Sequence, residues 1–312
     1  MIALRHRLEY FAVAVLAASF RALPMKFGST LGAMIGMTFY VFDGRHRRRA
    51  ITNLASAFPS HSRRECCAIA RSVFRHFGSL LVGLLQFSSL SPADMRARVE
   101  FEGLERLQQA YASGRGVLIF TGHFGYWEML AIAHGLEIGP LSLLARPLDN
   151  PWLEAMLKRI RTCTGNPIIY RRGAVRRVIR ALSVKQAVGI PIDQHIHGAD
   201  AVQVNFFKRP VATTSIVAAL ALRTGAVVIP VFALGLPGGR YRLIYEHAVP
   251  PPVDEGPEAV KEFTQRCTDV LEKYVRQYPE LWLWMHRRWR DTMPEMRDYR
   301  NTRGANGRRD IV

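Results

Sequence analysis

The sequence predicts an α/β fold with a mostly parallel central sheet flanked by helices. Apolar, β-prone runs alternate along the chain with runs of helical periodicity, as successive strand–crossover–strand units require. The 312 residues are 49% hydrophobic, so the chain can bury a large core. A histidine-containing turn at 121–125 follows one buried run, and open α/β sheets place their chemistry where a strand ends and a helix begins.

The first 43 residues differ from the rest of the chain. Two apolar runs, 11–20 and 27–42, are separated by Pro24, and neither reaches the about 20 residues of a spanning helix. Basic residues flank the region on both sides, which is typical of a shallow membrane anchor or a re-entrant hairpin. The alternative is an amphipathic helix packed on the protein's own core.

We therefore predict three parts of the chain. Residues 1–43 form a membrane-anchoring segment, 44–297 form the α/β domain, and 298–312 form a disordered basic tail because they are polar and rich in Gly and Arg.

Helical spacing dominates residues 45–87, where Ser62 followed by Glu65 predicts a helix start. A short helix is expected over 101–112, before the buried strand at 117–120. The other expected elements are a helix from Tyr126, a strand-like run at 141–145, a helix at 152–161, a strand at 168–170, a helix ending at 182, a strand at 188–192, a helix at 211–223, strands at 226–233 and 241–245, and a helix at 258–276.

The charge of the chain indicates what kind of partner it has. A net charge of +18 favours nucleic acid, an acidic membrane face, phosphorylated lipid or an acidic carrier protein, without choosing among them. The four cysteines lack CxxC or zinc-finger spacing, which indicates reduced thiols in a cytosol-facing protein. The motifs of serine hydrolases, P-loop proteins, dinucleotide-binding folds and HExxH proteases are absent.

His123 and Glu128 form a candidate acid–base pair. On one regular helix their side chains would point about 140° apart, so they can meet only if His123 lies on the turn and Glu128 on the first helical turns. Glu128 would then accept a hydrogen bond from one imidazole nitrogen and make the other a stronger base. With no nucleophile beside it, the pair suits direct attack of a substrate hydroxyl on an activated acyl group. The alternative is a structural histidine and a solvent-facing glutamate.

A second polar cluster follows the strand at 188–192. It contains Asp193, His195 and His197, whose alternating histidines resemble zinc or iron ligands on a strand. Polar residues after a strand are more often ordinary loop residues, so we expect no metal and no cofactor.

Seven strings of the chain, in order, resemble the lipid A biosynthesis lauroyl/myristoyl acyltransferases of the lysophospholipid acyltransferase superfamily. The first motif of that superfamily is H-x4-D/E, a weak signal alone, whereas seven strings together are specific. The strings are NLASAFP at 53–59, TGHFGYWE at 121–128, ARPLDNP at 145–151, the run at 188–194 ending in DQ, FFKRPVATT at 206–214, TGAVVIPVF at 224–232 and PELWLWMHRRWR at 279–290. The chain departs from the family at Tyr126, where Asn is common, and at Gly83 and Gln86, where a glutamate is common; both bear on acceptor choice.

The resemblance implies a glycerolipid acyltransferase-like fold and a specific reaction. A fatty acyl chain would move from an acyl carrier protein or coenzyme A thioester to a hydroxyl of a phosphorylated glycolipid acceptor of the lipid A type, without a covalent acyl-enzyme. His123 would be the general base and Glu128 its partner. Arg146 would contact a phosphate or stabilise the transition state, and Asp193 with Gln194 would shape the third block of the site. The catalytic domain would face the cytoplasm at the inner membrane.

Three other interpretations compete with this one. The same residues could acylate a phosphatidylinositol mannoside or a lysophospholipid. A nucleic-acid-binding protein would explain the basic residues at 45–49 and the Trp/Arg-rich end, but not the His–Glu pair, so we expect no nucleic acid partner. A catalytically inactive membrane scaffold would tolerate loss of His123.

Overall fold

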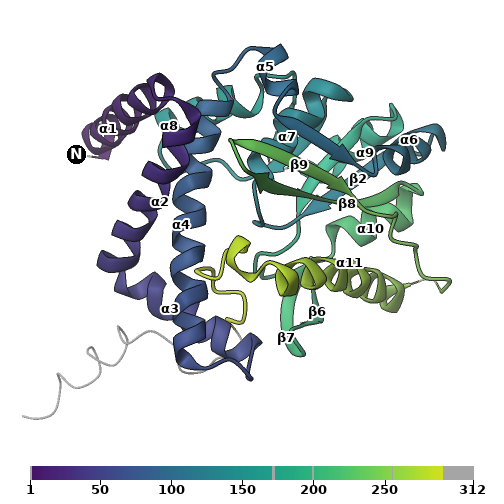
Figure 1. Ribbon diagram of the computed structural model, residues 1–312. Coiled ribbons are helices and arrows are strands. Elements are labelled where there is room, and N and C mark those ends of the chain that lie inside the picture. The colour runs from purple at the N-terminus through teal and green to yellow at the C-terminus, as the bar shows by residue number, and fades with distance from the viewer. Residues whose placement is uncertain (1, 171–172, 199, 255, 291–312) are drawn as a thin grey trace, which may run out of the picture.

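A seven-stranded sheet forms the centre of the molecule, and the prediction of a mostly parallel α/β fold is confirmed (Figure 1). The computed structural model describes residues 2–170, 173–198, 200–254 and 256–290. All neighbouring strands of the sheet are parallel except β8 and β9. The strand order is β1 (Val99–Glu102), β9 (Arg240–Tyr245), β8 (Val227–Leu236), β2 (Val117–Thr121), β5 (Ala187–Pro191), β3 (Leu141–Ala145) and β4 (Ile168–Tyr170).

Helices cover both faces of this sheet, which explains why the central strand is a continuous apolar run. Alternate residues of β2 point to opposite faces: Val117 and Ile119 pack beneath α6 and α7, whereas Leu118 and Phe120 pack with α9, α10 and α11. The helices are α5 (Pro92–Arg96), α6 (Leu104–Ala112), α7 (Trp127–Glu137), α8 (Pro151–Arg161), α9 (Ala174–Ser183), α10 (Ile216–Thr224) and α11 (Pro257–Gln277), followed by the short 3-10 helix η1 (Pro279–Leu281).

The N-terminal helices form a separate layer at one side of the sheet (Figure 1). They are α1 (Ile2–Ala22), α2 (Met25–Phe42), α3 (Gly44–Ala57) and α4 (Arg63–Phe87). The predicted start of α4 is confirmed, because Ser62 and Glu65 form a capping box. Glycine lets α2 approach α4 closely: a Cβ on Gly36 would lie within 1.9 Å of the Phe74 carbonyl oxygen.

Apolar side chains are exposed along α1 and α2. Phe11 is 68% exposed on α1 and Phe42 is 83% exposed on α2. Among the described helices, α4 has the length and apolar character to cross a membrane, but 56% of its most apolar window is buried in the protein. The helix α2 contains a shorter apolar stretch, Phe27–Phe42.

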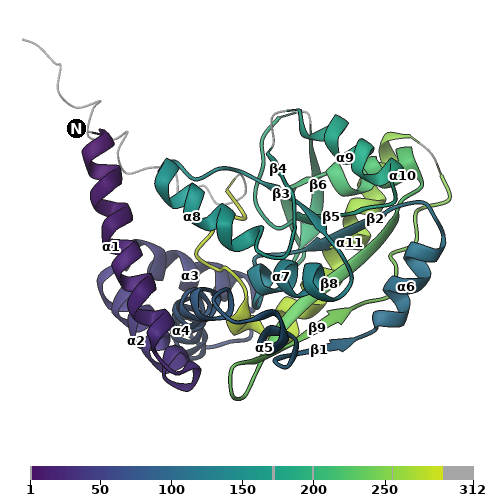
Figure 2. The same ribbon diagram turned by 90° about the horizontal axis from the view of Figure 1, so that it is seen from above.

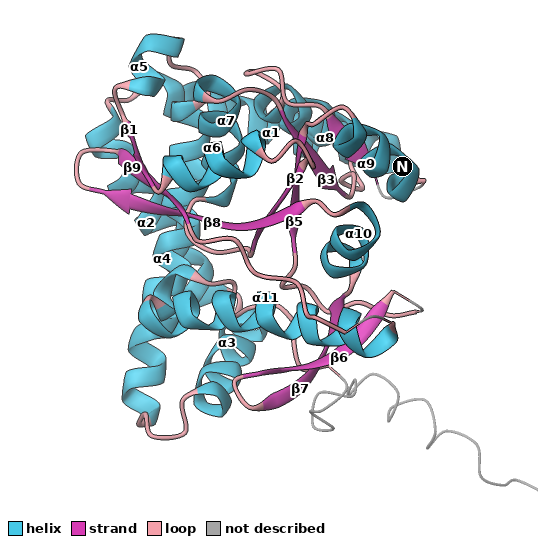
Figure 3. Ribbon diagram, turned by 90° about the vertical axis from the view of Figure 1, so that its right-hand side faces the viewer, coloured by secondary structure: helices cyan, strands magenta, loops and turns pink. Residues whose placement is uncertain are grey.

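Three strands differ from the sequence-based expectations. The strand β1 occupies residues assigned to the start of a helix at 101–112. The predicted helix at 211–223 is wrong over residues 211–214, which belong to β7 (Arg209–Thr214), the strand before α10. That strand pairs with β6 (Ala201–Phe206) in an antiparallel hairpin that packs on α11 (Figure 3). The predicted tail at 298–312 lies outside the described residues.

Candidate active site

The pairing of β2 with β5 brings two of the predicted site residues together. Thr121 and Pro191 are register partners at the carboxyl ends of these adjacent parallel strands. Two residues beyond each partner stand His123 and Asp193, at the edge of the sheet where open α/β folds place their sites.

Asp193 holds His123 by two hydrogen bonds. The ring Nδ1 of His123 donates to Asp193 Oδ1 at 2.7 Å, and the backbone N–H of His123 donates to Oδ2 at 2.7 Å. The indole Nε1 of Trp282 also donates to Oδ2, at 2.8 Å. Because an ionised carboxylate only accepts hydrogen bonds, Nδ1 carries the proton and Nε2 is the basic nitrogen. A glycine at 122 permits this approach, since a Cβ there would lie 3.1 Å from Asp193 Oδ2.

The electrostatics of the pair favour an ionised Asp193 and a more basic His123. Burial alone would raise the pKa of the Asp193 carboxyl, but the charge of His123 and the hydrogen bonds lower it to about 2. Burial alone would lower the pKa of His123, but the Asp193 charge and hydrogen bond raise it overall, with a further contribution from Glu128. His123 therefore has the orientation and the raised proton affinity of a general base.

The prediction of a hydrogen bond between His123 and Glu128 is wrong. The Glu128 carboxylate instead binds Arg161, whose Nε donates to Oε2 at 2.9 Å and whose Nη2 donates to Oε1. The side chains are only 11% and 17% exposed, so the pair is largely desolvated. Arg161 lies at the last turn of α8, and burying Glu128 without a cation would carry a large desolvation penalty.

A cavity of about 500 Å³, called here the catalytic cavity, opens beside this pair. His123, Glu128, Arg161 and Gln194 contribute polar groups, and strands β2, β3 and β5 contribute apolar side chains. The amide Nε2 of Gln194 lies 3.2 Å from His123 Nε2, as a donor to the basic nitrogen requires. Gln194 is exposed, so a substrate hydroxyl can replace its amide without unfolding the site.

Arg146 lies at the edge of the same cavity. It directly follows β3 and forms a 3.4 Å ion pair with Asp149. The Arg146 side chain is 73% exposed and its pair is surface-accessible, so the interaction contributes little to stability. This position is compatible with contact to a ligand at the cavity mouth.

His195 and His197 do not form a metal site with Asp193 in the part of the chain that the structure describes. Among the described residues, no cluster of three His, Cys, Asp or Glu side chains is suitably arranged to hold a metal ion. The rings of His195 and His197 contact each other, and Arg290 lies 3.2 Å from His197 Nε2.

Two residues of this site were not predicted from the sequence. Arg161 stands at the end of a helix, where a basic residue is common, so its position carries no functional signal. Trp282 lies 89 residues from Asp193 and belongs to the Trp-rich string that the family resemblance included. Arg161 could have been suggested only by the expectation that a buried Glu128 needs a cation as its partner.

Comparisons with known proteins identify the family. The family model for bacterial lipid A biosynthesis acyltransferase matches residues 2–291. The chain is 28% identical over 288 residues to the lipid A biosynthesis palmitoleoyltransferase of Escherichia coli K12, covering 92% of each chain. It is 28% identical over 281 residues to the lauroyltransferase of the same organism, covering 88% of each. The crystal structure of the 1-acyl-sn-glycerophosphate acyltransferase PlsC from Thermotoga maritima aligns with a TM-score of 0.38 and 15% identity, covering 81% of this chain and 97% of that one. The chain belongs to the bacterial lipid A biosynthesis acyltransferase family and is an acyltransferase of lipid A biosynthesis.

Proposed function

We propose that this acyltransferase moves a fatty acyl chain from a thioester donor to a hydroxyl of a lipid A-type phosphoglycolipid, with His123 as general base. The observation that carries the proposal is the hydrogen bond from His123 Nδ1 to the buried Asp193 carboxylate. It leaves the basic Nε2 at a cavity that also has apolar walls for an acyl chain.

The reaction needs one base and no protein nucleophile. His123 Nε2 takes the proton of the acceptor hydroxyl as its oxygen attacks the thioester carbonyl carbon. The tetrahedral intermediate then collapses, the carbon–sulfur bond breaks, and the imidazolium returns the proton to the leaving thiolate. Asp193 stabilises the imidazolium that forms between these steps, so it acts as a positioning residue for His123.

Arg161 supplies positive charge to the same cavity. Glu128 binds two of the guanidinium nitrogens and fixes the plane of the group, which leaves the remaining N–H groups of Arg161 for a ligand. We assign to Arg161 the stabilisation of the oxyanion of the tetrahedral intermediate, and to Glu128 the positioning of Arg161. Glu128 thus contributes to the reaction through Arg161 and through its charge near His123.

The N-terminal helices support a location at the membrane surface. Exposed apolar side chains on α1, among them Leu8 and Phe11, suit insertion between lipid headgroups and acyl chains. The helix α1 lies beside α8 (Figure 2), where Asn150 Nδ2 donates to the His6 carbonyl oxygen at 2.9 Å and to Glu9. Since Asp149 borders the catalytic cavity, this attachment would hold the cavity mouth close to the lipid. We propose the cytoplasmic face of the inner membrane, where a thioester donor is available.

The donor is the second part of the proposal. A carrier protein or coenzyme A would bring negative charge to a protein of net charge +18, and complementary charge accelerates association. Arg146, exposed at the cavity mouth, is the residue that we expect to contact donor phosphate.

An acyl-transfer assay of the purified protein tests the function. Each donor class, acyl carrier protein and coenzyme A thioesters, is offered with a lipid A-type acceptor, a phosphatidylinositol mannoside or a lysophospholipid. We expect transfer to the lipid A-type acceptor, abolished by His123→Ala and lowered roughly 10²-fold or more by Glu128→Ala. Full activity of His123→Ala, or transfer only to another acceptor, would contradict the proposal. Mass spectrometry of lipids from a deletion strain identifies the acceptor in the cell, because the acceptor lipid is the one that loses an acyl chain.

A further inference from the structure

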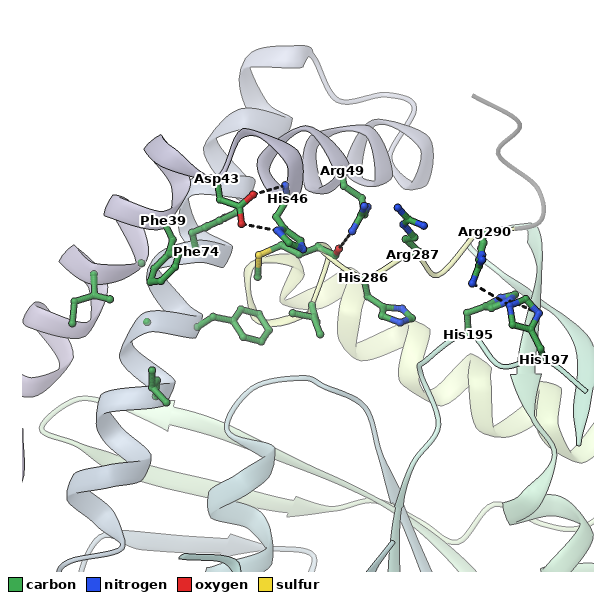
Figure 4. Close-up of a pocket in the computed structure, with 17 residues that line it drawn as sticks. Phe39, Asp43, His46, Arg49, Phe74, His195, His197, His286, Arg287 and Arg290 are labelled. Atoms are coloured by element: carbon green, nitrogen blue, oxygen red, sulfur yellow. Dashed lines mark hydrogen bonds and ion pairs between the residues drawn. The ribbon is translucent and has the colours of Figure 1, made fainter. Parts of the chain in front are cut away.

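A second cavity, of about 650 Å³, lies between the N-terminal helices and the C-terminal segment (Figure 4). We call it the helix pocket. One wall is apolar and is formed by α2, α4 and the segment after η1. Its apolar side chains include Ile35, Phe39, Phe74, Phe77, Leu81 and Met285.

The other wall of the helix pocket is cationic. Arg49 is only 9% exposed; its Nη1 donates to the Met285 carbonyl oxygen at 3.2 Å, while its buried Nε has no hydrogen-bond partner among the described residues. His286 Nδ1 is likewise buried without a partner in that part of the chain. Buried polar nitrogens are usually satisfied, and Arg49 Nε always carries a hydrogen, so this nitrogen indicates a ligand that accepts a hydrogen bond.

Positive charges in the helix pocket are not balanced by carboxylates. Burial lowers the pKa of Arg49, and the nearby charge of Arg287 lowers it further. Figure 4 shows both guanidinium groups on the same side of the pocket. Asp43 is the carboxylate among the described lining residues, and it is bound by the ring Nδ1 of His46 at 2.6 Å and by the backbone N–H of His46. An anion would relieve the repulsion between Arg49 and Arg287.

The helix pocket and the catalytic cavity are lined by consecutive residues of the loop after β5. Gln194 contacts His123 and lines the catalytic cavity, and the next residue, His195, lines the helix pocket. His286, which also lines the helix pocket, is close enough to interact with the charges of Asp193 and His123. A ligand in the helix pocket therefore lies near His123.

We propose that the helix pocket binds a phosphate group of the lipid acceptor. Arg49 and Arg287 bind the phosphate, and the apolar wall of α2 and α4 contacts the lipid's acyl chains. The donor acyl chain occupies the catalytic cavity, so the two substrates bind in different cavities. This assignment rests on the proposed acyl transfer and adds the residues that select a phosphorylated acceptor. Arginine suits this role because its planar group forms paired, charge-assisted hydrogen bonds with phosphate.

Steady-state kinetics with two acceptors test the site. One acceptor is the phosphorylated lipid A-type glycolipid, and the other is the same lipid after phosphatase treatment. We expect Arg287→Gln to raise the KM for the phosphorylated acceptor about 10-fold, with a smaller change in kcat, and to remove most of the preference over the dephosphorylated lipid. Arg49→Lys keeps the charge but loses the planar group, and should raise the same KM.

The matched control is Arg223→Gln. Arg223 is exposed at the end of α10, which lies at the opposite end of the molecule from α2, α3 and α4 (Figure 1), and its loss changes the net charge by the same amount. It should leave both KM values unchanged. Equal increases in KM for both acceptors with Arg287→Gln, or equal effects of the two glutamine variants, would overturn the phosphate site.

Binding measured without turnover separates this inference from the proposed function. Native mass spectrometry in detergent counts the phosphorylated and dephosphorylated lipid molecules retained by the wild type, Arg287→Gln and Arg223→Gln. We expect selective loss of the phosphorylated lipid from Arg287→Gln, even if the acyl-transfer assay failed for every donor. Inorganic phosphate at millimolar concentration should not displace the lipid, because it lacks the acyl chains that contact α2 and α4. Displacement by inorganic phosphate would indicate a site for a soluble anion instead.

Discussion

The catalytic cavity and the helix pocket both lie near His123, but their charged groups are arranged in different ways. Around the catalytic cavity, Asp193 binds His123 and Glu128 binds Arg161, so each ionisable group has a fixed partner. In the helix pocket, Arg49 and Arg287 lie near each other while Asp43 is occupied by His46. Paired charges hold reacting groups in one geometry before the substrate arrives, whereas unpaired charges gain most of their stabilisation from a bound ligand. The comparison predicts that substitutions in the catalytic cavity change kcat and that substitutions in the helix pocket change KM.

His123→Ala should give the largest effect. The proposed reaction has no other base, so kcat should fall by about 10³-fold or more, while binding of the phosphorylated lipid stays near the wild-type level. Single-turnover acyl transfer and native mass spectrometry measure the two quantities separately. A variant that lost lipid binding together with kcat would break the division between the two cavities.

Asp193→Asn should lower kcat by about 10²-fold or more, because asparagine cannot hold the proton on Nδ1 as a carboxylate does. Its pH dependence gives a sharper test. Asp193 raises the pKa of His123, and the proposed reaction requires neutral His123, so wild-type activity should fall as the pH drops through that raised pKa. Without the carboxylate the pKa of His123 falls, and the acid limb of the kcat/KM profile should move to lower pH. An unmoved acid limb would show that His123 is not the group that titrates.

Glu128 and Arg161 should behave as one unit. Removing either partner leaves the other charge largely buried and unpaired, at a cost of roughly 3–5 kcal/mol in the free energy of unfolding. In a double-mutant cycle with Glu128→Gln and Arg161→Gln, the two losses of stability and of kcat should therefore be strongly non-additive. Additive losses would mean that Glu128 acts on His123 directly, as its spacing in the sequence first indicated.

A comparison of Glu128 with Asp193 shows which contacts of His123 could be predicted from the sequence. His123 was identified from its turn after a buried run, and that location is confirmed. The distance of five residues made Glu128 the obvious partner, but the contact to Asp193 spans 70 residues. It depends on β2 lying next to β5 in parallel register, which no local pattern specifies.

The hairpin of β6 and β7 was missed for a different physical reason. Its two-residue turn, Phe207 and Lys208, has positive φ at both positions, a conformation that usually requires Asn, Asp or Gly. Tertiary contacts stabilise it here: Glu272 accepts a hydrogen bond from the Phe207 backbone N–H, and Arg276 lies 4.3 Å from the centre of the Phe207 ring. By contrast, the start of α4 was predictable because its capping box lies within four consecutive residues.

Substitutions on α1 extend the comparison to the membrane. Leu8→Ser with Phe11→Ser removes two exposed apolar side chains, which are 62% and 68% exposed, without altering either cavity. Each buried side chain of this size contributes about 1.5–3 kcal/mol, so vesicle binding should weaken at least 10-fold. Activity on vesicle-embedded acceptor should fall with binding, whereas activity in detergent should not. Equal loss in detergent would mean that α1 serves the fold of the domain.

Gln194→Ala should have the smallest effect and tests the boundary between the two cavities. The Gln194 amide occupies the hydrogen-bonding position of His123 Nε2 that the acceptor hydroxyl takes in the proposed reaction, so we expect it to compete with the substrate and to exclude water. Removing the amide should favour acceptor binding but should also admit water, so the two effects oppose each other. We expect kcat to change by no more than about threefold, as is typical for one exposed hydrogen bond. Hydrolysis of the thioester donor without acceptor should rise, because water gains access to Nε2. A 100-fold fall in kcat would instead mean that Gln194 binds the reacting groups, and that the two cavities form one continuous site.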